Sequence, residues 1–183
     1  MSEDLVIRHC SPTLAGLKTG SLFSCVCQSE AEIRRDVREL NQILVPKGLI
    51  ALPLRCMENR ALIYLYRPDR LRQDLSHEQA LALLERMGYS CLSTDRCLVE
   101  LMQRLQQQAD FPHEIGLFLG YPPEDVRGFI EHRGKGYKCV GCWKVYGDEE
   151  QAQKRFALYE ECTKIYYKQW SKGASIERLT VPA

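Results

Sequence analysis

Cys139 and Cys142, two cysteines separated by two residues, are the side chains of this chain that most clearly could carry chemistry. Thiols at this spacing share a metal ion or form a redox disulfide when the chain turns between them, and Gly141 makes a turn easy. In an uninterrupted strand the same two positions point to opposite faces. Nearby cations, such as Lys138 and Lys144, would favour the thiolate. The leading hypothesis is therefore a thiol-based metal-binding or redox function.

Further ligands for such a site would come from histidine. His113 and His132 are the candidates, because they lie in the same glycine-rich stretch of the sequence as the two cysteines. Zinc or iron would suit a mixed set of cysteine and histidine ligands. A single Cys-x-x-Cys pair is equally consistent with two half-buried structural cysteines beside a strand, so both interpretations stay open.

His113 and Glu114 form a second candidate site, for a hydrolase or transferase. A histidine in the first turn of a short helix stays neutral and can act as a base, with the glutamate as its partner. A structural role in capping the helix is favoured over catalysis. Glu114 suits a helix start, and the dipeptide lacks the second histidine of a zinc-protease helix.

The basic, glycine-containing loop from Arg127 to Lys138 is a third candidate. Its cations could bind a phosphate-bearing small molecule or nucleotide as a cofactor, with Arg133 and Lys135 between the two ends. A solvated connection is the commoner role for such a loop, because no basic face interleaved with aromatic residues accompanies it. A structural or protein-interaction domain is the fourth hypothesis.

Composition limits the partners and the compartment. The net charge of +1 argues against a nucleic-acid partner, and leaves an unidentified small molecule or protein. No apolar stretch approaches the roughly 18 residues that span a bilayer, and the N-terminal residues do not resemble a secretory leader. Nine cysteines is an odd number, which argues against a complete disulfide framework. We therefore expect a cytoplasmic protein in a reducing or anaerobic cell, with no membrane association.

Turn and capping signals divide the chain into strands and helices. In chain order, the first predicted segments are a loop up to Gly20, a strand at 21–27, a helix capped by Ser29 and Glu32, and a hairpin with strands at 48–56 and 60–67. Four helices follow: one that starts at the capping box of Ser76 and Gln79, one at about 95–108, one that starts at Pro112 and one that starts at Pro123. A strand at 137–146 and a long helix capped by Asp148 complete the prediction.

This order predicts an α+β fold, or a small mixed α/β sheet, in one compact domain at 1–170. About five to six helices would pack on a short sheet. Residues 171–183 are expected to form a loose C-terminal tail.

The chain resembles an uncharacterised bacterial family, the domain-of-unknown-function family 3793. The resemblance covers roughly Cys10 to Tyr167, and its matching segments are Ser11–Cys25, Asn59–Leu71, Phe111–Ile130 and Tyr137–Gly147. It implies the cytoplasm of an anaerobic Gram-positive bacterium, where nine unpaired cysteines would stay reduced. It implies no activity and brings no catalytic or binding residue.

Overall fold

The computed structural model describes residues 1–107 and 110–183, and their contacts divide the chain into two compact units. The first unit comprises residues 1–69 and 159–183, and the second comprises residues 70–158. Helices combine with two separate antiparallel sheets, so the predicted α+β class is confirmed. The described residues form nine α-helices, more than the five to six that the sequence predicted.

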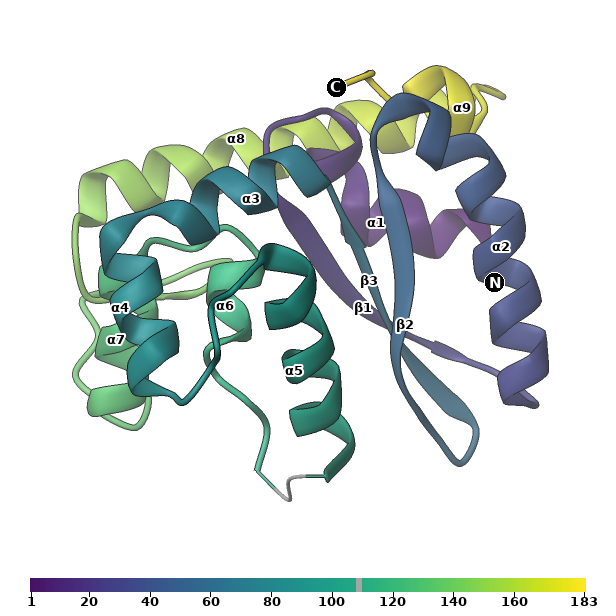
Figure 1. Cartoon of the computed structure of the whole chain (residues 1–183). Helices are drawn as coiled ribbons and strands as arrows, with labels where there is room; N and C mark the ends of the chain where they lie inside the picture. The colour runs from purple at the N-terminus through teal and green to yellow at the C-terminus, as the bar shows by residue number, and fades with distance from the viewer. Residues whose placement is uncertain (108–109) are drawn as a thin grey trace. The chain divides into compact units, whose positions relative to one another are not determined.

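A three-stranded antiparallel sheet forms the centre of the first unit (Figure 1). The strands are β1 (Gly20–Val26), β2 (Ile50–Met57) and β3 (Arg60–Tyr66), in the order β1-β3-β2. The predicted β2–β3 hairpin is confirmed, with a register shift between Pro53 and Arg55. Both faces of β3 are buried, because Ile63 on one face and Tyr64 on the other are fully covered.

Helices α1 (Glu3–Leu14) and α2 (Glu30–Leu44) share one hydrophobic core with the sheet face that carries Ile63. The predicted cap of α2 is confirmed, since the Ser29 hydroxyl accepts a hydrogen bond from the backbone N–H of Glu32. The short 3₁₀ helix η1 (Val45–Lys47) then leads to β2.

Helix α1 occupies residues that the sequence predicted to be a loop. Its buried stripe includes Val6, Cys10 and Leu14, which recur at helical spacing. Pro12 is tolerated because it lies in the last turn, so its missing N–H removes only one hydrogen bond before the helix ends. The loop prediction was wrong because it gave Pro12 more weight than this stripe.

The C-terminal residues are ordered, contrary to the loose tail expected from residue 171. Helix α9 (Ile176–Leu179) buries Ile176 in the core of the first unit. The buried Arg67 guanidinium donates hydrogen bonds to the carbonyls of Leu14 and Val181, at 2.8 and 2.7 Å. One side chain thereby ties the end of the chain to the end of α1.

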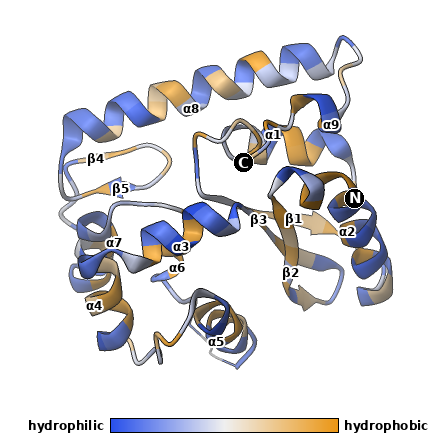
Figure 2. Ribbon diagram, turned by 45° about the horizontal axis from the view of Figure 1, so that its top comes forward, coloured by the Kyte–Doolittle hydropathy of each residue, from blue (hydrophilic) through white to orange (hydrophobic). Residues whose placement is uncertain are grey.

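The long helix α8 (Glu149–Trp170) begins as predicted, because the Asp148 carboxylate accepts a hydrogen bond from the N–H of Gln151. In Figure 2 it is mainly hydrophilic, with hydrophobic residues recurring along it. Among the described residues, no helix combines the length and the apolar character needed to cross a bilayer.

Besides the first part of α8, the described residues of the second unit form the helices α3 (Pro68–Ser76), which starts just before it, α4 (Glu78–Arg86), α5 (Thr94–Gln107), α6 (Ile115–Phe118) and α7 (Pro123–Glu131). The predicted capping box at Ser76 is wrong. Its hydroxyl donates back to the carbonyl of Gln73 in α3, and His77 precedes α4 without a side-chain cap. Gln108, the predicted end of α5, lies outside the described residues.

The strand predicted at 137–146 is a hairpin instead. Strand β4 (Cys139–Val140) pairs antiparallel with β5 (Lys144–Val145), and the chain reverses around Gly141. The turn that the thiol hypothesis required therefore exists.

Candidate functional site

One carboxylate of α7 holds the β4–β5 hairpin in place. Oδ2 of Asp125 accepts a hydrogen bond of 2.7 Å from the indole Nε1–H of Trp143. Oδ1 accepts hydrogen bonds from the backbone N–H groups of Tyr146 and Gly147, both at 2.7 Å. Asp125 is only 2% exposed, so its charge is balanced by these three donors rather than by water.

Aromatic side chains surround Trp143 on two sides. Its indole stacks on the ring of Tyr121 at a centroid distance of 4.7 Å and meets Phe156 edge to face at 4.5 Å. Gly141 lies so close to Phe156 that a Cβ there would overlap the ring. The Tyr121 hydroxyl donates to the carbonyl of Cys142 at 3.3 Å. These contacts fix the position of the indole.

A cavity of about 310 Å³ opens beside these rings, and we call it the aromatic cavity. Its mainly apolar walls include Tyr121, Val126, Phe129, Val140 and Trp143, and its polar lining includes His113, Asp125, Cys142 and Lys144. Small-molecule sites have this character: apolar walls, a few placed polar groups, and a volume of roughly 300–1,000 Å³.

Lys144 places a positive charge at this cavity. Its Nζ donates to the carbonyl of Gly134 at 2.8 Å and lies 4.7 Å from the ring centroid of Tyr137. His113 packs edge to face on Phe129, with ring centroids 4.8 Å apart. The cavity thus combines aromatic walls with one ammonium group that is held in position.

In the basic loop, the backbone N–H groups that follow α7 are already hydrogen-bonded. The N–H groups of residues 132–135 all donate to carbonyls within the turn that closes α7. Lys138 donates to the carbonyl of Gly147 at 2.6 Å. The side chains of Arg127, Arg133 and Lys135 are exposed. The N–H groups of residues 132–135, including that of Gly134, therefore serve helix closure, and the exposed side chains are the groups of this loop best placed to bind an anion.

The two cysteines of the Cys-x-x-Cys pair have different surroundings. Cys142 lines the aromatic cavity, whereas Cys139 interacts with Glu149 and Gln153 of α8. Loss of hydration, followed by the negative charge of Glu149, raises the pKa of the Cys139 thiol. We expected cations to favour the thiolate here, but at Cys139 the first charge that acts on the pKa of the thiol is the negative one of Glu149.

The structure brings together only part of the predicted metal-ligand set. His113 and Cys142 line the same cavity, while His132 stacks on Tyr146 at 5.7 Å and does not line it. Within residues 1–107 and 110–183, no group of three or more His, Cys, Asp and Glu side chains could hold an ion. Zinc or iron binding by Cys139 and Cys142 stays a prediction.

His113 and Glu114, the candidates for a hydrolase or transferase, have different partners. Glu114 is 2% exposed, accepts a hydrogen bond of 3.0 Å from the Tyr89 hydroxyl and lies 3.5 Å from the Arg104 guanidinium. His113 is exposed and packs on Phe129. The glutamate is thus committed to a buried ion pair.

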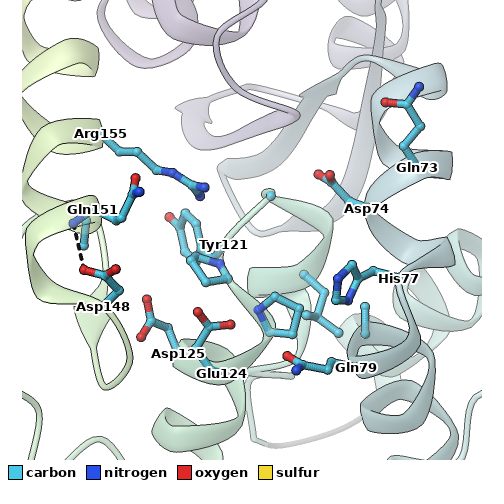
Figure 3. A pocket seen from close by; sticks show the side chains of 16 residues that line it. Gln73, Asp74, His77, Gln79, Tyr121, Glu124, Asp125, Asp148, Gln151 and Arg155 are labelled. Atoms are coloured by element: carbon cyan, nitrogen blue, oxygen red, sulfur yellow. Dashed lines mark hydrogen bonds between the residues drawn. The ribbon is translucent and has the colours of Figure 1, made fainter.

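A second cavity, of about 420 Å³, is bordered by several polar and charged side chains (Figure 3), and we call it the second cavity. The labelled side chains come from α3, the start of α4, the residues around the start of α7 and the first turns of α8, and they include Asp74, His77, Glu124, Asp125, Asp148, Gln151 and Arg155. Two of its acids have structural roles, because Asp125 holds the hairpin and Asp148 caps α8. Glu124 lies in the first turn of α7, where acids are favoured. These roles explain most of its negative charge.

Sequence reasoning missed the residues that build the aromatic cavity, namely Tyr121, Phe129, Trp143 and Lys144 as a set. One signal was available, because a tryptophan in a glycine-rich turn needs a partner for its N–H. Nothing in the sequence, however, pointed from Trp143 to Asp125. No motif marked the residues of the second cavity.

The comparison with protein families matches residues 6–180 to the family described as Protein of unknown function (DUF3793), so the chain belongs to this family. The resemblance inferred from the sequence is thereby confirmed. Neither the curated proteins nor the solved structures include a significant match to the chain.

Proposed function

We propose that this member of the DUF3793 family is a small-molecule-binding module, and that its ligand places a planar ring in the aromatic cavity. The observation that carries the proposal is the cavity itself, about 310 Å³ in volume and walled by the rings of Tyr121, Phe129 and Trp143. Aromatic walls favour a flat, unsaturated ligand, because stacked or edge-on rings add stabilisation to the burial of apolar surface.

The fixed position of Trp143 supports the proposal. Its N–H is bound by Asp125, and its ring lies between Tyr121 and Phe156. A wall that is already ordered loses little conformational entropy when a ligand binds, and this increases affinity. His113 and Cys142 need no metal to explain their positions, since both line the same cavity.

Thermal-shift measurements and calorimetry with planar compounds test the proposal. The compounds are purine and pyrimidine nucleosides, their monophosphates, nicotinamide, nicotinate, riboflavin and flavin mononucleotide. We expect at least one to bind saturably with one site per chain. If none of them binds, the proposal fails.

The variant Cys142→Phe tests the location, because it adds a ring to an exposed residue that lines the cavity. We expect it to weaken binding at least tenfold. Cys56→Phe is the matched control, since Cys56 is also exposed but lies on β2 in the first unit. Equal affinities of the two variants would place the ligand elsewhere.

A further inference from the structure

We infer that the ligand of the aromatic cavity carries an anionic group beside its ring, and that Lys144, Arg133 and Lys135 bind this group. The inference rests on the proposed function and names the chemical class of its ligand. Phosphate and carboxylate share the required negative charge, and the experiment below distinguishes them.

Lys144 is the cation that lines the aromatic cavity. Its Nζ is oriented by the carbonyl of Gly134 and by the ring faces of Tyr137 and Phe129, at 4.7 and 5.7 Å from their centroids. An ammonium group carries three donors, and the hydrogen bond to Gly134 uses one of them. Lys144 therefore keeps donors for a ligand at the cavity that it lines.

The loop of residues 133–135 approaches Lys144 and carries two further cations. A Cβ at Gly134 would lie 3.2 Å from the ring of Phe129 and 3.4 Å from Nζ of Lys144, so this glycine borders two residues of the cavity wall. Arg133 and Lys135 flank Gly134 in sequence and are exposed. In the described part of the chain, neither has an ion-pair partner. Two more cations are therefore attached to the backbone on either side of a glycine that borders this wall.

The nearby acids do not cancel this charge. Asp125 is the sole carboxylate among the described residues that line the aromatic cavity, and both of its oxygens accept hydrogen bonds from N–H groups. Glu131, at the end of α7, pairs with Arg86 at 2.7 Å. The remaining positive charge favours an anionic ligand over a neutral or cationic one.

A single-tryptophan protein makes the test specific. The chain has two tryptophans, and Trp170→Phe leaves Trp143, which lines the cavity, as the fluorescence reporter. Quenching of this reporter is titrated with pairs of probes that share a ring: adenosine and adenosine monophosphate, riboflavin and flavin mononucleotide, and nicotinamide and nicotinate. The first two pairs report on phosphate, and the third reports on carboxylate.

We expect the anionic member of at least one pair to bind about threefold to tenfold more tightly than the neutral member at low salt, as one or two exposed ion pairs would give. This preference should shrink in high salt, because exposed charges are screened. The double variant Arg133→Ala, Lys135→Ala should lose most of it while keeping the affinity for the neutral member. The control Lys168→Ala, Lys172→Ala removes the same charge from the first unit and should change nothing.

The possible failures are distinguishable. If neutral and anionic members bind equally, the inference is overturned and the proposed function stands. The same holds if the preference survives in both the Arg133, Lys135 double variant and Lys144→Gln. If no probe quenches Trp143 or shifts the melting temperature, the proposed function fails, and the inference fails with it.

Discussion

Trp143 donates its indole N–H to Asp125 at 2.7 Å, and both residues are buried, at 8% and 2% exposure. The same carboxylate accepts the N–H groups of Tyr146 and Gly147. The Asp125 side chain of α7 therefore positions two parts of the hairpin. These are the indole of Trp143, just after the turn, and the backbone of Tyr146 and Gly147, just after β5. The shape of the aromatic cavity depends on this carboxylate, although both of its oxygens already accept hydrogen bonds from the protein.

Replacing Asp125 with Asn should destabilise the protein by roughly 2–4 kcal/mol, because an amide NH₂ must then face at least one buried N–H group. Glu124→Gln is the matched control, because Glu124 is the sequence neighbour of Asp125 and is only half-buried. This substitution should change the free energy of unfolding by no more than about 0.5 kcal/mol. Urea denaturation followed by tryptophan emission and circular dichroism measures both. Equal stability of the two variants would contradict the structural role of Asp125.

Gly141→Ala should destabilise the hairpin by roughly 1–3 kcal/mol, because the added methyl group overlaps the ring of Phe156. In a background that already carries Phe156→Ala, the same substitution should cost almost nothing. A double-mutant cycle of unfolding free energies measures this coupling. Additive effects would show that the two residues are not in contact.

Alkylation of Cys139 should require a higher pH than an ordinary thiol, because loss of hydration and Glu149 raise its pKa. A raised pKa means less thiolate at neutral pH. Glu149→Gln removes the negative charge, so the pKa should fall and alkylation at neutral pH should become faster. Rates measured by peptide mass spectrometry across a pH series test this.

Glu150→Gln is the control for this series, because Glu150 is paired with Lys154 on the surface and should leave the rate unchanged. An alkylation midpoint for Cys139 below the ordinary thiol pKa would contradict the prediction. It would also favour a redox function for the Cys-x-x-Cys pair.

Arg104→Leu should destabilise the second unit by roughly 2–4 kcal/mol, because it leaves the buried Glu114 carboxylate without its cation. The guanidinium also covers the ring of Tyr89 at 4.2 Å. Arg96→Leu, on the same helix, removes a more exposed arginine 3.8 Å from Glu100 and should change stability by about 0.5 kcal/mol or less. Chemical denaturation measures the free energy of unfolding of both variants. Similar losses of stability in the two variants would refute the prediction.

Local signals predicted the elements whose ends are set by their own sequence. The cap of α2 at Ser29, the β2–β3 hairpin and the cap of α8 at Asp148 were all correct. Errors arose where a distant partner decides the structure. Pro12 suggested a loop, but burial of Val6 and Cys10 maintains the helix, and the expected loose tail is fixed by Arg67.

The candidate site was less predictable than the fold. The sequence drew attention to Cys142 and His113, and the structure places both at one cavity. It could not show that Cys139 interacts with α8, or that Asp125 bonds to Trp143. These relationships arise from contacts between segments that lie far apart in sequence, and no local spacing encodes them.

The division of the chain into units has a consequence for its synthesis on the ribosome. The second unit is one continuous segment, residues 70–158, and all of it emerges before the residues that complete the first unit. The first unit must wait for residues 159–183, which supply Ile176 to its core and Val181 to Arg67. During translation, residues 1–69 are therefore made before residues 70–158, but their apolar core stays incomplete until residues 159–183 have been made.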